Sequence, residues 1–262
     1  MTVLASLPMY AAGSAANAAL WQCVADQLNS AAVPATLAQP TDLLAHWLDP
    51  ALLLSQTCGY PLTHALAGRV QLVGAFRYTA PGCDGLRYRS QLVCRSTDAG
   101  LPLAGFRGRT VAYNSEDSQS GHNSLRALVA PLARNGVFFG KAVATGSHHA
   151  SLESVCSGQA DLAAIDCVTL ALLQRDHPEK LRGVQVCGHT APAPGLPLIT
   201  SLQTPPDVLL ALRQALHHAM RAEALAGARA ALLIEDFSEL PLDDYDAITL
   251  MEARATRAGY RL

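Results

Sequence analysis

A run of small polar residues between a predicted strand and a predicted helix is the segment of this sequence best suited to chemistry. The helix begins near Leu125, and Ser118, Gln119, Ser120 and Gly121 precede it. The first amides of a helix lack intrahelical acceptors and lie at the positive end of the helix dipole, which suits an oxyanion. The serine hydroxyls and the Gln119 amide would add donors, and Gly121 would let a ligand approach the backbone. An ordinary helix cap with a serine-rich turn has the same pattern.

Two further polar side chains follow predicted strands. His148 comes after the strand at 141–144, and a histidine can donate a hydrogen bond to an oxyanion in either protonation state. Asp166 follows the apolar strand at 162–165, where an ionised carboxylate would accept the proton of a monoprotonated phosphate or the amine of an aminophosphonate. The alternatives are that His148 is a loop histidine and that Asp166 caps a helix starting at Cys167.

Four aromatic or hydroxyl residues are further candidates for ligand contact. Tyr88 lies on a predicted strand that crosses between lobes, and its hydroxyl would reach the anion; otherwise it is a half-buried strand aromatic. Tyr10, Thr57 and Tyr60 lie in turns that follow predicted strands. Ligands of open α/β sheets bind beyond the carboxyl ends of the strands, although each of these three also fits an ordinary turn residue.

The elements that must position these residues follow an α/β pattern, because short apolar runs alternate with helical segments almost from end to end. Apolar stripes predict helices over 14–29, after Pro205-Pro206, and over 242–258. Short apolar runs predict strands at residues 3–7, 35–38, 51–55, 70–75, 90–95, 110–113, 141–144, 162–165 and 183–187.

Two segments are predicted to connect two lobes. One is the strand through 88–95 with the polar turn behind it, and the other is the proline- and glycine-rich run 189–195. These crossings predict an inner lobe of residues 95–193 and a discontinuous outer lobe of residues 1–94 and 194–262. This arrangement is typical of a hinged protein that holds its ligand in the cleft between lobes.

Composition narrows the function classes. Charged residues make up 15% of the chain and the net charge is −2, so nothing favours binding to nucleic acid or to an anionic membrane. No apolar stretch reaches about 18 residues, the length of a transmembrane helix. No secretory pattern is visible because the first basic residue is Arg69, so either an export signal has been removed or the protein stays in the cytoplasm. The 7 cysteines are irregularly spaced without a CxxC pair, which predicts neither a disulfide framework nor a zinc site and favours a reducing compartment.

Three motifs resemble the family of periplasmic binding proteins for phosphate, phosphite and phosphonates. The stretch 103–114 is followed by Ser118-Gln119-Ser120-Gly121, where the family carries Ser-Thr-Ser-Gly. Gly146-Ser147-His148 and the helix and strand over 150–166 are similar to a second family motif, and Tyr88-Arg89-Ser90 is similar to the Tyr-x-Ser that opens the family's crossing strand. The three motifs occur in the family's order over most of the chain.

The resemblance implies a two-lobed type 2 periplasmic-binding-protein fold, in which each lobe is a mostly parallel sheet flanked by helices. It also implies a monomeric solute-binding component of an ABC-type uptake system that captures phosphate, phosphite or a phosphonate, with a permease as its partner and the periplasm as its location. Ser118–Gly121, His148 and Tyr88 would hold the anion, and no cofactor, metal or catalysis is expected. Gln119 departs from the family's threonine and the outer lobe matches only loosely, so the resemblance indicates a ligand class and not one ligand.

Two other functions fit the same fold. Some cytosolic enzymes of menaquinone and thiamine biosynthesis are two-lobed and lack an export signal, and His148 or Cys58 would then be the catalytic candidates. The sequence carries no nucleophile–base motif such as GxSxG and no metal-ligand spacing. A stand-alone ligand sensor is the other alternative, although no helix-turn-helix segment precedes the fold.

Overall fold

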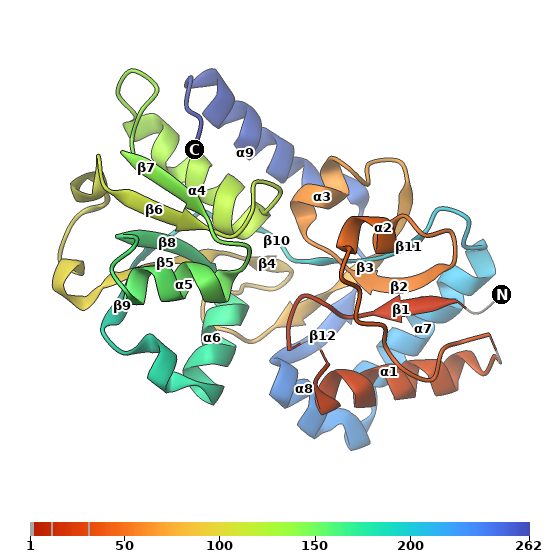
Figure 1. Cartoon of the computed structure of the whole chain (residues 1–262). Coiled ribbons are helices and arrows are strands. Elements are labelled where there is room, and N and C mark those ends of the chain that lie inside the picture. Colours follow the sequence, from red (N-terminus) through yellow and green to blue (C-terminus); the bar gives the residue numbers. More distant parts are fainter. Residues whose placement is uncertain (1–2, 12, 31) are drawn as a thin grey trace. The chain divides into compact units, whose positions relative to one another are not determined.

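The structure is a computed structural model that describes residues 3–11, 13–30 and 32–262 (Figure 1). The chain forms two compact units, and it passes between them three times. The first unit runs to Thr79 and resumes over Gly195–Asp244, and the second comprises Ala80–Pro194 and Tyr245–Leu262. Met1 and Thr2, which precede the predicted first strand, lie outside the described residues. None of the helices in the described part of the chain is long and apolar enough to span a bilayer.

The boundaries of these units differ from the predicted outer lobe, 1–94 with 194–262, and from the predicted inner lobe, 95–193. Residues 80–94 and 245–262 belong to the second unit. Strand β5 (Ser90–Arg95), predicted to be a crossing, pairs along its length with two strands of the second sheet. Helix α9 (Asp246–Arg257) packs against α4 (Ser124–Val129) of the same unit. A boundary after residue 94 would therefore separate β5 from its sheet.

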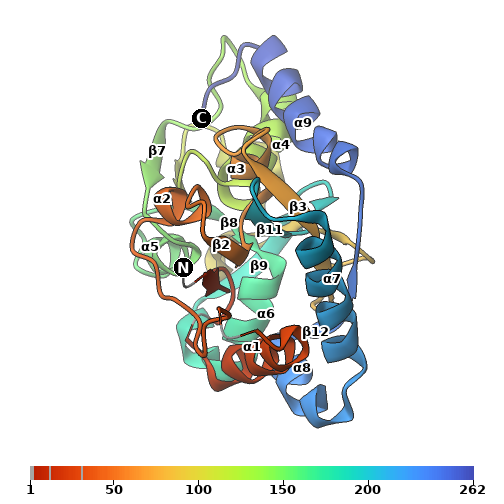
Figure 2. The same ribbon diagram turned by 90° about the vertical axis from the view of Figure 1, so that its right-hand side faces the viewer.

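The first unit is built on a sheet of order β1-β2-β11-β3-β12. Its strands are Leu4–Ser6, Leu52–Gln56, Pro197–Ser201, Val70–Tyr78 and Ile234–Ser238, in that order. The β1–β2 pair is parallel, and the other pairings are antiparallel. Helix α1 packs against α7 and α8 (Figure 2), and the helices of this unit are α1 (Ala15–Leu28), α2 (Leu43–Trp47), α3 (Gly59–Thr63), α7 (Pro206–Arg221) and α8 (Ala226–Leu232).

The predicted first helix is confirmed, including its ends. Ser14 is the N-cap, and its hydroxyl accepts a hydrogen bond from the Asn17 amide at 3.2 Å. Asn29 ends the helix in the left-handed conformation, which asparagine tolerates. The apolar stripe of Leu20 and Val24 is buried, as the periodicity predicts.

The second unit holds a sheet of order β7-β6-β8-β5-β9. Strand β6 (Thr110–Tyr113) is parallel to β7 (Lys141–Ala144) and β8 (Leu162–Asp166), whereas β5 is antiparallel to β8 and β9 (Val184–His189). The α/β class is therefore confirmed, but both sheets are mixed and not mostly parallel. Strand β11 is antiparallel to both of its neighbours in the first sheet, as β5 is in the second, and β12 is also antiparallel to β3.

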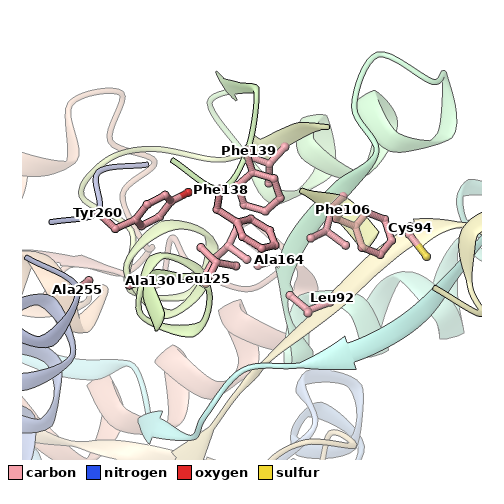
Figure 3. Close-up of a cluster of buried hydrophobic side chains, with 13 residues drawn as sticks. Leu92, Cys94, Phe106, Leu125, Ala130, Phe138, Phe139, Ala164, Ala255 and Tyr260 are labelled. Carbon is pink, nitrogen blue, oxygen red and sulfur yellow. The ribbon is translucent and has the colours of Figure 1, made fainter. Parts of the chain in front are cut away.

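Helices cover both faces of the second sheet (Figure 1). One face carries α5 (His148–Cys156) and α6 (Cys167–Asp176), whose Leu152, Val155 and Leu170 pack on alternate residues of β5, β6 and β8. The other face carries α4 and the C-terminal segment. Figure 3 shows this second core, in which Leu92, Leu125, Phe106, Phe138 and Tyr260 are buried together.

Several local predictions were wrong or incomplete. Residues 35–38 form no strand, although the Ala38 amide donates to the Ala5 carbonyl at 2.7 Å. Strands β11 and β12 were missed because β11 begins with a proline and β12 carries two acidic residues. The sequence also did not reveal the short antiparallel pair of β4 (Arg87–Tyr88) and β10 (Ala193–Pro194).

An ion-pair network closes the end of the second sheet at which β6 and β8 begin. Arg95 donates to Asp161 Oδ1 at 2.6 Å, and Asp161 Oδ2 accepts from the Thr110 amide at 2.9 Å. Burial opposes ionisation of Asp161, but the hydrogen bonds from Thr110 and Arg95 outweigh it and lower the pKa of this carboxyl. Asp161 therefore links the start of β6 to the end of β5.

We predict that Asp161→Asn lowers the free energy of unfolding by about 1–2 kcal/mol, because one charge-assisted hydrogen bond is lost while the side chain is only partly buried. Urea unfolding at neutral pH measures the change. Asp176→Asn, which breaks the exposed pair with Arg175, is the matched control and should leave stability nearly unchanged. Equal effects of the two substitutions would contradict a structural role for Asp161.

Candidate functional site

The serine-rich run after β6 forms the start of a helix. Ser118 is in an extended conformation, and its hydroxyl accepts from the Gly121 amide at 3.0 Å. Residues Gln119–Asn123 make a π-helical turn that continues directly into α4. π-Helical turns occur frequently at functional sites. The predicted helix start is therefore confirmed, and its first amides precede a continuous helical segment that ends at Val129.

His148 lies beside this helix start. It is the first residue of α5, which Ser147 caps by accepting from the Ala150 amide at 3.1 Å. His148 Nε2 is 2.8 Å from Ser120 Oγ. The contact follows from the topology: β6 and β7 are parallel neighbours, so the turns after both strands lie at the same edge of the sheet.

The structure thus brings together Ser118, Ser120, Gly121 and His148, which we name the anion cradle. Ser118 Oγ and Ser120 Oγ are 3.4 Å apart. A Cβ atom at Gly121 would overlap Asn114 Oδ1 and would lie 3.2 Å from His148 Cε1, so only glycine fits between these side chains. Ligand binding by the cradle stays a prediction.

Asn114, the residue directly after β6, is part of the cradle that the sequence did not single out. Its Oδ1 position is buried and has no hydrogen-bond partner among the described residues. Since the oxygen and nitrogen of an amide are assigned from their partners, the same position can present an NH2 donor. A buried polar group without a partner is costly, which makes Asn114 a candidate ligand contact. Its position directly after a predicted strand is the sequence feature that could have identified it as a candidate.

Ser90, the first residue of β5, holds the π-helical turn from across β8, the strand that lies between β5 and β6. Its hydroxyl donates to the Ser120 carbonyl at 2.8 Å. The backbone of Ser90 is fixed in turn by Thr190, whose amide donates to the Ser90 carbonyl at 2.9 Å and whose Oγ1 accepts from the Ser90 amide at 3.0 Å. The family motif included Ser90, but its role as a support for Ser120 was not predicted.

The side chain of Gln119 does not supply the donor that we expected. It is fully buried; its Oε1 accepts from Asn123 at 2.7 Å, and its Nε2 donates to Ser124 Oγ at 2.9 Å and to Met251 Sδ at 3.4 Å. The amide is long enough to reach across the first helical turn to α9. The side chain therefore stabilises the packing of the helix start and α4 on α9.

Asp166 lies at the end of β8, and Tyr88 lies on β4 in the separate two-stranded sheet. Asp166 is the pairing partner of Ser90, and its Oδ1 accepts from the Val168 and Thr169 amides at 2.8 and 3.0 Å. The helix-cap alternative is thus confirmed for this oxygen. The Tyr88 side chain is buried on β4, where its backbone pairs with Ala193. Contacts of Asp166 or Tyr88 with a ligand stay predictions.

The candidates of the first unit form a separate group. Tyr10 is buried and packs edge-to-face on Tyr78 with ring centres 5.2 Å apart, and Gln56 Nε2 donates to the Tyr78 hydroxyl at 2.9 Å. Thr57 is buried and its amide donates to the Pro197 carbonyl. Tyr60 stacks on His64 at 3.8 Å. Tyr78, at the end of β3, links the turn after β1 to the last residue of β2, and the sequence analysis did not identify it.

The cradle is electrically neutral at pH 7. Burial lowers the pKa of His148 to about 4, the neighbouring His149 acts in the same direction, and the Ala164 carbonyl opposes them. The donors are therefore hydroxyls, a neutral imidazole, an amide and helix-start N–H groups, all of which can bind an oxyanion. No three His, Cys, Asp or Glu side chains in the described part of the chain converge as metal ligands would.

Comparisons with known proteins bear on the family and the fold of the chain. Residues 41–245 match the family described as periplasmic substrate-binding proteins of phosphonate ABC transporters. A search of curated proteins finds no match.

Solved structures share the fold over nearly the whole chain. A binding-protein component of a phosphonate ABC transporter from Pseudomonas aeruginosa is 18% identical, with 98% of this chain and 87% of that chain covered and a TM-score of 0.75. PhnD1 from Prochlorococcus marinus, in complex with methylphosphonate, is 12% identical, with 98% and 99% covered and a TM-score of 0.77. A Xanthomonas citri protein bound to ATP is 16% identical, with 98% of each chain covered and a TM-score of 0.71. The predicted fold of two-lobed periplasmic binding proteins is thus confirmed.

We predict that His148 makes stability depend on pH in the acidic range. Its pKa is about 4 in the folded chain against an ordinary 6.5, so the unfolded chain binds the proton first as the pH falls. The free energy of unfolding should decrease between pH 6.5 and pH 4, by at most about 3 kcal/mol from this residue. Urea unfolding of His148→Gln across this range should show a shallower slope than the unsubstituted chain.

His218→Gln, an exposed substitution on α7, serves as the control and should keep the full slope. Identical slopes for His148→Gln and the unsubstituted chain would contradict a buried, neutral His148.

Proposed function

The chain belongs to the family of periplasmic substrate-binding proteins of phosphonate ABC transporters, and from this membership we propose that it captures a small phosphorus oxyanion for an ABC permease. The ligand class is phosphate, phosphite or a phosphonate. The observation that carries the proposal is the 2.8 Å contact of Ser120 Oγ with His148 Nε2 at the start of a helix. That the ligand lies between the two units, and that the protein is an exported monomer, stay predictions from the sequence.

The cradle suits a tetrahedral anion because its donors come from several directions. The hydroxyls of Ser118 and Ser120, the imidazole N–H of His148 and the helix-start amides would each meet an oxygen of the ligand. In the proposed complex Ser120 and His148 exchange their mutual hydrogen bond for bonds to the anion. The amide of Asn114 gains the partner that it lacks in the described structure.

We propose capture without chemical conversion. A serine nucleophile needs a base whose pKa lies near the working pH and whose ring is oriented by a third group. The Ser120–His148 pair has the geometry of such a contact, but a histidine with a pKa of about 4 is a weak base at neutral pH. The group beside the ring that favours its protonation is the Ala164 carbonyl and not a carboxylate. These features favour the binding protein over the enzyme alternative.

Thermal unfolding with phosphate, phosphite, methylphosphonate, 2-aminoethylphosphonate, ATP and sulfate tests the proposal. A ligand at ~100 times its Kd should stabilise the chain by about 2.7 kcal/mol. For a chain of this size this corresponds to a rise in Tm of roughly 5–10 °C. A rise with sulfate alone, or with none of these anions, would overturn the proposed ligand class.

Substitutions in the cradle should weaken binding of the anion found in this way. Ser120→Ala and His148→Ala each remove one hydrogen bond to a charged ligand, which is worth about 1.5–3 kcal/mol. The Kd measured by calorimetry should therefore rise about 10- to 150-fold. Ser157→Ala, which removes an exposed hydroxyl at the end of α5, is the matched control and should leave Kd unchanged. A cradle variant that binds as tightly as this control would place the ligand elsewhere.

Asp166→Asn separates the two roles considered for this residue. Asparagine keeps an oxygen that caps α6 but loses the negative charge, so the Tm should change little. If the carboxylate binds the amine of an aminophosphonate, Kd should rise at least about 10-fold for 2-aminoethylphosphonate and not for methylphosphonate. Unchanged affinity for both ligands would show that Asp166 caps α6 and does not bind the ligand.

A further inference from the structure

Two cysteines far apart in the sequence lie in contact in the second unit. Cys83 Sγ is 3.5 Å from Cys167 Sγ, although 84 positions separate the residues. Cys83 is partly exposed and lies in the loop just after the chain enters the second unit at Ala80. Cys167 is buried at the first position of α6.

The loop that carries Cys83 is fitted closely to the start of α6. Gly82 has a φ of +109°, and a Cβ atom there would lie 3.0 Å from Cys167 Cβ and 2.9 Å from Gln91 Nε2. Gln91 Nε2 also donates to the Pro81 carbonyl at 3.2 Å. Glycine at position 82 therefore allows the loop to approach Cys167, and the hydrogen bond from Gln91 on β5 fixes the position of the loop.

The backbone of each cysteine is also anchored. The Cys83 amide donates to the Ala80 carbonyl at 2.9 Å, and the Cys167 amide donates to the Arg89 carbonyl at 3.2 Å. The two sulfurs are thus held near each other by backbone on both sides. A disulfide requires about 2.05 Å between sulfurs, which a small movement of the exposed loop supplies.

We propose that Cys83 and Cys167 are a disulfide-forming pair that joins the loop at the unit boundary to α6. The oxidant is a small-molecule or protein disulfide. The Cys83 thiolate attacks one sulfur of the oxidant and releases a first thiolate. Cys167, after losing its proton, then attacks Cys83 Sγ and releases the second thiolate. The two protein thiols are oxidised by two electrons while one external disulfide is reduced to two thiols.

The order of attack follows from the surroundings. The hydrogen bond with Cys83, burial and the nearby Asp166 all raise the pKa of the Cys167 thiol. Cys83 is the more accessible thiol of the pair. Because the thiolate is the nucleophile, Cys83 reacts first, and its mixed disulfide removes the hydrogen bond that holds the proton on Cys167.

Another pair, Cys94 and Cys187, provides a comparison within the same unit. Burial and the hydrogen bond with Cys94 raise the pKa of Cys187 to about 12. Cys94 is fully buried within β5, and Cys187 lies on the adjacent β9, so both belong to paired strands. The pair has no exposed loop that could move, and we therefore assign the disulfide to Cys83 and Cys167.

In the test, the purified chain is equilibrated in buffers that cover a range of ratios of reduced to oxidised glutathione. Free thiols are then alkylated. Digestion without reductant and mass spectrometry should detect a peptide that links Cys83 to Cys167, with the loss of two thiols per chain. The oxidised chain should melt at a higher temperature, and reduction should reverse both changes. Absence of the link at every ratio, or a link between Cys94 and Cys187 instead, would overturn the assignment.

Substitutions make the test specific. Cys83→Ser and Cys167→Ser should each abolish both the link and the rise in Tm, whereas Cys156→Ser, at an exposed cysteine of α5, should retain them. Gly82→Ala should reduce the linked fraction at a given ratio, because its side chain crowds Cys167 and Gln91. A linked fraction in Gly82→Ala equal to that of the unsubstituted chain would contradict the role given to the loop.

Discussion

The start of the helix after β6 leaves backbone amides without intrahelical acceptors, and the rest of the candidate site is arranged around this constraint. Ser118 satisfies the Gly121 amide, and the π-helical turn continues into α4. Ser90, on β5, donates to the Ser120 carbonyl and thereby fixes the turn. Ser120, on this turn, meets His148 at the start of α5, so the proposed ligand site depends on how the helix start is held.

The groups of the cradle are neutral, although the proposed ligand is charged. Burial keeps His148 uncharged, and the other donors are hydroxyls, an amide and backbone N–H groups. Such a site gains little from long-range attraction, so its affinity depends on how many hydrogen bonds the ligand completes. Sites of this kind discriminate strongly against analogues that leave a donor unpaired. We therefore expect the geometry and the proton count of an anion, more than its total charge, to decide whether it fits the proposed site.

Local sequence patterns were sufficient to predict the strands and helix starts that build the cradle, but they were insufficient to predict the long-range contacts between these elements. Strands β5, β6 and β7 have the predicted ends, and because β6 and β7 are parallel neighbours the predicted residues Ser120 and His148 meet. The unit boundary was misplaced because β5 looks like a connecting strand until its two partners in the sheet are known. The inward turn of Gln119 and the contact of Cys83 with Cys167 depend on neighbours more than 80 positions away, which no local pattern encodes.

Asp166 shows how the fold can restrict the ligand further. Its Oδ1 accepts from two helix amides, and Asp166 pairs with Ser90, whose hydroxyl donates to the Ser120 carbonyl. A dianion in the cradle would be repelled by such a carboxylate. A ligand that brings a proton or an amine would offset the repulsion, because either group can donate to an acceptor oxygen. We therefore expect the cradle to prefer monoprotonated or zwitterionic phosphorus anions, since a carboxylate that caps α6 would also act on the ligand.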